Sequence, residues 1–227
     1  MKKNKNNSSK KKKLSIMLYV IISILLMAFI EIIIEPNYLI KSLIKIFIFF
    51  GIPFIILKKL KIRILDNFKV NKKDFIKLVK IGIGVFISGV VSYLILRNFF
   101  DFSELTKSLL VDQQVSKSQF ILVALYISFG NSLLEEFMFR LISFIKLKEY
   151  CDKKTAYLFS AFMFSIYHAA MFVFSFPPII ICISLSGLFI LGLLFDYLDD
   201  KDNNIYNSWI VHMFADFIIM IVGFISL

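Results

Sequence analysis

The chain has 227 residues, of which 59% are hydrophobic and 19% are charged, and its formal net charge is +11. Soluble domains of this size are about half apolar and about a quarter charged, so the composition excludes an ordinary soluble domain. Most lysines lie in short segments beside long apolar runs, which is typical of membrane topology and not of a nucleic-acid-binding surface. We therefore expect an all-α, polytopic membrane protein that contacts membrane lipid and no nucleic acid.

The N-terminal segment, residues 1–13, reads MKKNKNNSSKKKK and contains too few apolar residues to form a core. We expect it to be a disordered, basic tail in the cytoplasm. The apolar run from Leu14 to Ile34 is too long for the hydrophobic part of a secretory signal peptide, and no small-residue cleavage site follows it. This run predicts an uncleaved first span.

Six further apolar runs predict a transmembrane bundle of about seven spans, because roughly 20 apolar residues cross a bilayer as a helix. These runs are Leu39–Leu57, Phe75–Leu96, Phe120–Leu147, Thr155–Phe176, Pro178–Tyr197 and Ile205–Leu227. Residues 14–118 form an N-terminal region of about three spans. Residues 119–227 form a second region of about four spans, which carries the candidate site.

Basic segments between the spans predict their orientation, because such segments stay on the cytoplasmic side. The segments Lys58–Lys80 and Lys146–Lys154 are basic, whereas the charge of Arg97–Lys117 is balanced. With a cytoplasmic N-terminus, both basic segments fall inside and the balanced one falls outside. We expect a multi-pass protein of the cell membrane whose N-terminus is cytoplasmic.

Small residues and a proline predict local packing in two spans. Gly84, Ser88 and Ser92 recur at four-residue spacing in the third span, which predicts a face where a neighbouring helix approaches closely. Gly51 and Pro53 predict a kink in the second span.

The stretch FGNSLLEEFMFR, which ends at Arg140, places three charges inside the fourth apolar run. An ionised side chain at the centre of a membrane helix costs about 2.5–3.5 kcal/mol, so these charges are expected to face protein or a water-filled cavity. Glu136 and Arg140 lie one helical turn apart and can form an ion pair. Glu135 points to another side of the helix, with Asn131 one turn before it. The sequence therefore predicts a free carboxylate at Glu135.

Both histidines of the chain, His168 and His212, lie inside apolar spans. One such histidine could simply bond a backbone carbonyl, but two of them, with none in a loop, favour a shared role. Asp216 lies one turn after His212, where it can fix the imidazole tautomer or share a ligand site. Together with Glu135, these groups can activate water by general base catalysis or through a bound divalent metal such as Zn²⁺. The sequence leaves both routes open.

Three motifs, in order on three of these spans, resemble those of the CPBP family, the CAAX protease and bacteriocin-processing (Abi) intramembrane proteases. They are Glu135-Glu136-x-x-x-Arg140, Phe164-x-x-x-His168 and His212-x-x-x-Asp216. The resemblance extends from about Phe120 to the C-terminus. It implies a helical intramembrane endopeptidase with a cavity open to the cytoplasmic side.

The resemblance also implies a role for each motif. Glu135 is the water-activating base with His168 assisting it, and His212 with its motif partner Asp216 stabilises the oxyanion. The supporting residues are Glu136, Arg140, Asn131 and Phe164. The family is described both as metalloproteases and as metal-free enzymes, so a metal held by His168, His212, Glu135 and Asp216 stays open.

Asp216 departs from the eukaryotic members that cleave prenylated CAAX tails, which have Asn at this position. An ionised Asp cannot donate a hydrogen bond to an oxyanion as an amide does. Asp216 is therefore expected to orient His212 or to join a metal site. The departure argues against a prenylated substrate.

We expect the chain to cleave a peptide or a membrane-anchored protein, in processing of bacteriocin-like or signalling peptides or in self-immunity. A non-catalytic membrane immunity or binding protein could use the same polar cluster for recognition. A small ion or proton transporter is a third alternative, which the sequence disfavours because the N-terminal spans show no matching polar set.

Overall fold

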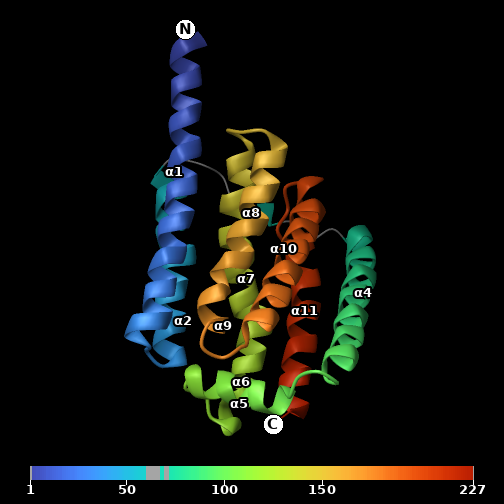
Figure 1. The fold of residues 1–227 in the computed structure, drawn as a ribbon. Helices are drawn as coiled ribbons and strands as arrows, with labels where there is room; N and C mark the ends of the chain where they lie inside the picture. Colours follow the sequence, from blue (N-terminus) through green and yellow to red (C-terminus); the bar gives the residue numbers. More distant parts are fainter. Residues whose placement is uncertain (1, 60–66, 69–71, 227) are drawn as a thin grey trace.

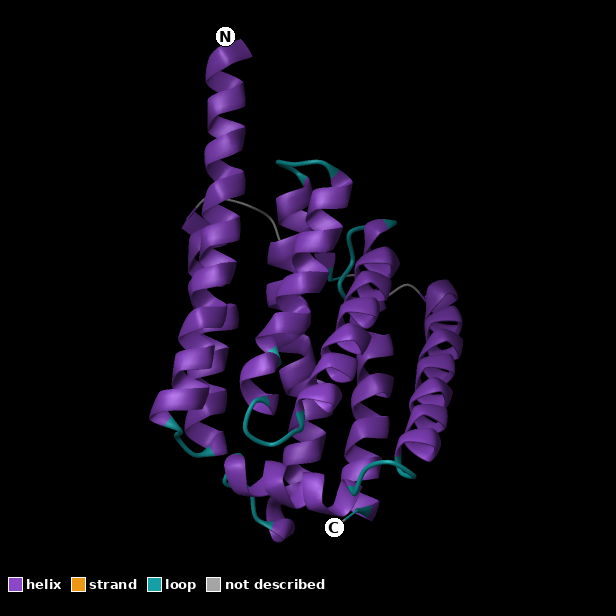
Figure 2. Ribbon diagram, viewed as in Figure 1, coloured by secondary structure: helices purple, strands orange, loops and turns teal. Residues whose placement is uncertain are grey.

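The computed structural model describes residues 2–59, 67–68 and 72–226, and within these ranges helices are joined by loops without any strand (Figure 2). The α-helices are α1 (Lys2–Phe29), α2 (Tyr38–Ile46), α3 (Ile52–Lys59), α4 (Lys72–Leu96), α5 (Phe102–Asp112), α6 (Phe120–Leu125), α7 (Ser132–Glu135), α8 (Lys153–Tyr167), α9 (Ala169–Phe172), α10 (Pro178–Asp200) and α11 (Tyr206–Ile225). Wider π-helical turns form η1 (Ile30–Ile34), η2 (Phe47–Gly51), η5 (Tyr126–Asn131) and η6 (Glu136–Lys146), and η4 (Lys117–Gln119) is a 3₁₀ turn.

Seven helical segments within the described ranges are long and apolar enough to cross a membrane. They are Ser9–Ile34, Tyr38–Lys58, Asp74–Leu96, Lys117–Lys146, Lys153–Phe172, Pro178–Asp200 and Tyr206–Ile225. Large apolar side chains such as Leu25, Ile87 and Ile190 remain exposed along these segments, as expected where a protein faces lipid. The predicted polytopic helical bundle is confirmed.

α1 begins at Lys2, within the range 1–13 over which the sequence predicts a disordered basic tail. No proline or glycine occurs between Lys2 and Phe29, so the helix of the first span can propagate outwards without a breaker. The first turns of α1 project beyond the rest of the bundle (Figure 1).

The spans alternate in direction, and the two ends of the chain lie at opposite ends of the bundle (Figure 1). α4 packs along α11, and α10 packs along α8. The segment η6 is central, because every side chain from Glu136 to Lys146 is buried. Part of the predicted basic connection Lys58–Lys80 lies outside the described residues.

The close packing of the third span uses glycines other than the expected one. A Cβ at Gly84 would meet nothing within 4 Å, so this face points outwards. A Cβ at Gly82 would lie 2.3 Å from the Phe214 ring, and one at Gly89 would lie 2.8 Å from the side chain of Ile218. The helix α4 therefore approaches α11 through Gly82 and Gly89.

Two spans change their helical geometry part-way along. In the second span, η2 ends at Gly51, and Pro53 lies in the first turn of α3, where its missing N–H leaves little unsatisfied. In the fifth span, the regular α-helix is interrupted at His168, between α8 and α9. Pro178 then starts α10 at a position that needs no N–H.

Candidate active site

Glu135, His168 and His212 meet inside the bundle although they come from three different spans. Glu135 ends α7, His168 lies between α8 and α9, and His212 lies in α11. Glu135 Oε2 lies 3.7 Å from His168 Nε2 and 3.8 Å from His212 Nε2. Both distances exceed a direct hydrogen bond, so the three atoms surround a position that a water or substrate oxygen can share. The structure thus brings together the residues that the sequence singled out.

Glu135 is not the free carboxylate that the sequence predicted, and this prediction was wrong. Lys45 Nζ donates hydrogen bonds to Glu135 Oε1 at 2.6 Å and to Asn131 Oδ1 at 2.5 Å. Asn131 Nδ2 donates to the same Glu135 oxygen at 2.9 Å. The prediction considered only cations on the same helix, whereas Lys45 lies 90 positions earlier in the chain.

The predicted ion pair between Glu136 and Arg140 is present and fully buried. Arg140 Nε lies 3.2 Å from Glu136 Oε2, and both side chains are 0% exposed. Arg140 Nη1 also donates to Ser160 Oγ at 3.1 Å and lies 3.5 Å from Asp196 Oδ1. The guanidinium carbon lies 4.6 Å from the centre of the Phe164 ring. This cluster joins η6 to α8 and α10 directly behind the two histidines.

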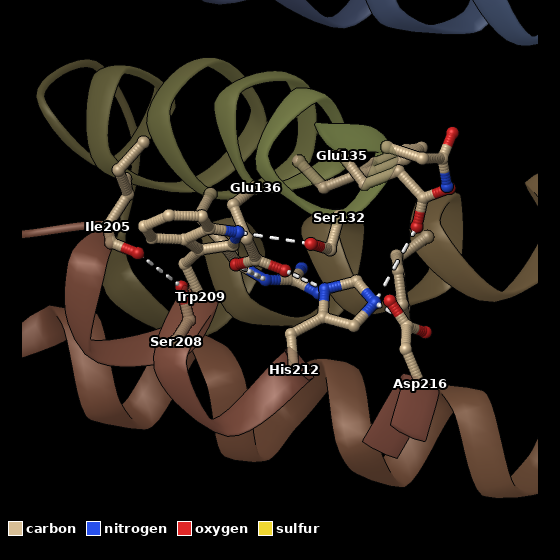
Figure 3. A network of polar contacts seen from close by, with 12 residues as sticks. Ser132, Glu135, Glu136, Ile205, Ser208, Trp209, His212 and Asp216 are labelled. Atoms are coloured by element: carbon tan, nitrogen blue, oxygen red, sulfur yellow. Dashed lines mark hydrogen bonds and ion pairs between the residues drawn. The ribbon is translucent and has the colours of Figure 1, made fainter. Parts of the chain in front are cut away.

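Glu136, and not Asp216, makes the short hydrogen bond to His212 (Figure 3). His212 Nδ1 donates to Glu136 Oε1 at 2.6 Å, whereas Asp216 Oδ1 lies 3.6 Å from His212 Nε2. A carboxylate on Nδ1 fixes the ring so that Nε2 faces Glu135. The tautomer-fixing role expected of Asp216 therefore falls to Glu136. Asp216 Oδ2 is buried and has no hydrogen-bond partner among the described residues.

His168 is oriented by the backbone. Its Nδ1 lies 2.8 Å from the Phe164 carbonyl oxygen, and because a carbonyl only accepts, Nδ1 donates. The Nε2 of the neutral ring is then an acceptor that faces Glu135. The Phe164 ring packs edge-on against both His168 and His212, with ring centres 5.0 and 5.7 Å apart. Phe164 thus holds both imidazoles in place.

A largely apolar cavity of about 530 Å³ contains the site. Its lining includes Glu135, His168, His212 and Asp216. The lining also includes residues of α5, of the start of α2 and of the end of α11. These elements lie at the end of the bundle opposite to the N-terminus (Figure 1).

The lining thus extends from Glu135 towards the end opposite to the N-terminus. The expected opening to the cytoplasmic side and the expected cytoplasmic N-terminus both stay predictions. The large side chains of Phe137, Phe139 and Phe144 in η6 are at most 2% exposed. These rings, together with Leu147 at 0% exposure, pack the core towards the N-terminal end of the bundle.

Residues 117–218 match the family described as type II CAAX prenyl endopeptidase Rce1-like. Residues 117–218 thus form a domain of the CAAX protease family. The family consists of intramembrane peptidases, so the chain is a hydrolase of this class. All three sequence motifs lie within the matched range, whereas Lys45 lies outside it. No curated protein and no solved structure matches the chain.

The donor groups of this CAAX protease do not fit a divalent metal. Across the described part of the chain, no three His, Cys, Asp or Glu side chains are arranged to hold an ion. The Lys45 ammonium already binds Glu135 Oε1, and its positive charge opposes a dication at the same carboxylate. The metal site proposed from His168, His212, Glu135 and Asp216 is therefore not supported.

Buried charges of the CAAX protease that sequence reasoning missed lie in the second and sixth spans. Lys41 and Lys45 are 7% and 5% exposed, and their four-residue spacing inside an apolar run is the signal that could have revealed them. Asp196 and Asp199 are fully buried in α10, and Asp199 accepts hydrogen bonds from the N–H and hydroxyl of Ser208. The N-terminal spans thus contribute polar groups to the interior of the bundle.

Proposed function

We propose that this CAAX protease hydrolyses a peptide bond in a membrane peptide or membrane-anchored protein, using water activated by Glu135. The observation that carries the proposal is the convergence of Glu135 Oε2 with the Nε2 atoms of His168 and His212, at 3.7 and 3.8 Å. A carboxylate and two imidazoles around one position are the groups required to orient water, remove its proton and stabilise the charge that develops.

The base in this mechanism is the ionised carboxylate of Glu135. The Lys45 ammonium at 2.6 Å stabilises that ionised form, and it leaves Oε2 directed towards the two histidines. Oε2 takes a proton from water as the water oxygen attacks the carbonyl carbon of the scissile bond. His168 Nε2 accepts a hydrogen bond from the second O–H of the water and so orients the nucleophile, while that hydrogen stays on the oxygen. The proton on Glu135 is then transferred to the leaving nitrogen, which restores the carboxylate.

The oxyanion that forms in this attack requires a donor, and His212 is placed to supply one. Glu136 lies 2.6 Å from His212 Nδ1, and Asp216 lies 3.6 Å from Nε2. Two carboxylates beside one ring stabilise the imidazolium, whose Nε2–H can donate to the oxyanion. Asp216 acts through the charge of His212, since a carboxylate cannot itself donate.

The cavity supports an extended apolar segment as the substrate. Its volume of about 530 Å³ falls in the range of ligand pockets, and most of its lining is apolar. Processing of bacteriocin-like or signalling peptides, or self-immunity against them, is the biological role that we propose from the family resemblance. Because Asp stands at 216, we propose a substrate without a prenyl group.

A non-catalytic binding or immunity protein is the second candidate. The observation that favours it is the ion pair between Glu135 and Lys45, since a buried pair can simply hold helices together. Such a protein would use the same cavity to hold a peptide without cutting it.

The two candidates are separated by comparing membrane proteomes of cells that produce the wild type or Glu135→Gln. New peptide termini should appear only with the wild type. Glu149→Gln is the matched control, because the Glu149 side chain is 46% exposed and is not part of the cavity lining. If the wild type and Glu135→Gln yield the same termini at equal abundance, hydrolysis through Glu135 is refuted. A peptide retained by both proteins would then favour the binding protein.

A further inference from the structure

Lys45 is a buried cation in the second span, and it lies outside the region matched by the family. A lysine inside an apolar span is costly unless its ammonium is paired and hydrogen-bonded. Its position in α2 brings the N-terminal half of the chain to the candidate active site. The contacts of this one ammonium therefore show what the N-terminal spans add to the reaction.

The two carboxylate oxygens of Glu135 have different environments because of Lys45. Oε1 accepts hydrogen bonds from Lys45 at 2.6 Å and from Asn131 at 2.9 Å. Oε2 lies 3.7 Å from His168 Nε2 and 3.8 Å from His212 Nε2. The ammonium also lies over the Tyr167 ring, 4.8 Å from its centre, which further fixes its direction.

We propose that Lys45 is a positioning residue of the peptidase, which holds Glu135 ionised and reserves Oε2 for the catalytic water. The proposal rests on the proposed hydrolytic function. Lys45 acts through Glu135 and is not placed in contact with the reacting atoms.

The other ionisable groups around Glu135 do not replace this cation. His168 and His212 face Oε2, and Asp216, which faces His212, adds a nearby acid instead of a positive charge. Tyr167 lies beside the ammonium and carries no charge as a phenol. Without Lys45, a buried Glu135 would lose its counter-charge and take up a proton, and it could then no longer act as a base.

Lys41 provides a matched control on the same helix. It is also buried, one turn before Lys45, and its ammonium pairs with a carboxylate, Glu31, at 2.8 Å. Gln113 accepts a second hydrogen bond from it at 2.9 Å. Lys41→Met therefore removes a buried, paired ammonium from α2 without touching Glu135.

The first test needs no substrate and uses infrared difference spectra of the full chain in phosphatidylcholine vesicles at neutral pH. Subtracting the spectrum of Glu135→Gln from that of the wild type should reveal the bands of an ionised carboxylate. In a Lys45→Met background, the same subtraction should reveal a protonated acid instead. In a Lys41→Met background, the carboxylate bands should persist. Carboxylate bands that survive in Lys45→Met would overturn the proposal.

Lys45→Gln keeps a hydrogen-bond donor without the charge, so it serves if Lys45→Met does not fold. It should also give the protonated acid, and retention of the carboxylate there would overturn the proposal equally. Lys45→Arg keeps a cation and should retain the carboxylate bands.

The second test uses a peptide that the wild type cleaves and Glu135→Gln does not. Lys45→Met should lower kcat by about 10²-fold or more with little change in KM, and Lys45→Arg should recover part of kcat. A rise in KM with unchanged kcat would overturn a positioning role. If no peptide is cleaved by the wild type, the hydrolytic function fails, whereas the infrared result still decides whether Lys45 controls the ionisation of Glu135.

Discussion

Glu136 Oε1 accepts a hydrogen bond from His212 Nδ1 at 2.6 Å, while Glu136 Oε2 pairs with Arg140 Nε at 3.2 Å. One buried carboxylate therefore links an ion pair inside the bundle core to an imidazole of the active site. A change at Arg140 is transmitted to His212 through this single side chain. Stability and catalysis are consequently coupled at Glu136.

Replacing Arg140 should lower both the abundance of the protein and its cleavage activity. Arg140→Ala leaves Glu136 and Asp196 buried without their cation, a loss of about 3–5 kcal/mol in the free energy of unfolding. Thermal unfolding in detergent and immunoblots of membranes measure this loss. Lys153→Ala is the control, because it removes an ion pair with Asp200 whose lysine side chain is 63% exposed, and about 0–1 kcal/mol is expected. Equal melting temperatures for the two variants would contradict a structural role of Arg140.

Removing both members of the Lys45–Glu135 pair should separate folding from catalysis. Glu135→Gln alone leaves the buried Lys45 ammonium without a counter-charge, and a loss of up to about 3 kcal/mol is expected. Combining it with Lys45→Met removes the uncompensated charge. The free energy of unfolding of the double variant should then return to within about 1 kcal/mol of the wild-type value. Cleavage should stay absent in both variants. A double variant that is less stable than Glu135→Gln would show that the two side chains are not coupled in this way.

Replacing Gly82 by alanine should weaken the packing of α4 on α11, whereas the same replacement at Gly84 should not. Gly82→Ala places a Cβ 2.3 Å from the Phe214 ring, which must shift, and a cost of about 1–3 kcal/mol is expected. Gly84→Ala meets nothing within 4 Å and should be neutral or stabilise the helix by about 0.5–1 kcal/mol. Melting temperatures of the two purified variants provide the comparison. The reverse order would refute the assigned α4–α11 interface.

Removing divalent metals should leave the peptidase active. The Lys45 ammonium occupies Glu135 Oε1, so the reaction is expected to use direct base catalysis. Cleavage by purified protein before and after exhaustive chelation, with elemental analysis of both samples, tests this expectation. Loss of activity on chelation, with recovery on adding a stoichiometric amount of Zn²⁺, would contradict it.

The orientation in the membrane should place the cavity on the extracytoplasmic side. The lysine-rich segments predict a cytoplasmic N-terminus, and α5, which lines the cavity, lies at the opposite end of the bundle (Figure 1). A cysteine introduced at the exposed Lys107 of α5, with Cys151 and Cys182 replaced by Ser, should react with a membrane-impermeant thiol reagent in intact cells. A cysteine at the exposed Lys201 should react only after permeabilisation. The opposite labelling pattern would invert the topology.

The sequence alone predicted the features that are set within one helix. Apolar runs of about 20 residues indicated seven spans, because hydropathy and length are local properties. The Glu136–Arg140 pair was predictable for the same reason, since residues four positions apart share a helix face.

Only the tertiary structure decided which groups meet between helices. Lys45 pairs with Glu135, and His212 bonds Glu136 instead of Asp216. These contacts, and the set of residues that line the cavity, depend on how the helices are rotated and shifted against one another. Hydropathy carries no information about rotation or height inside a bundle, because it records how apolar a span is and not which neighbour each side chain meets. The packing of large side chains around η6 fixes those relationships, and through them the site at which this CAAX protease can act on a peptide.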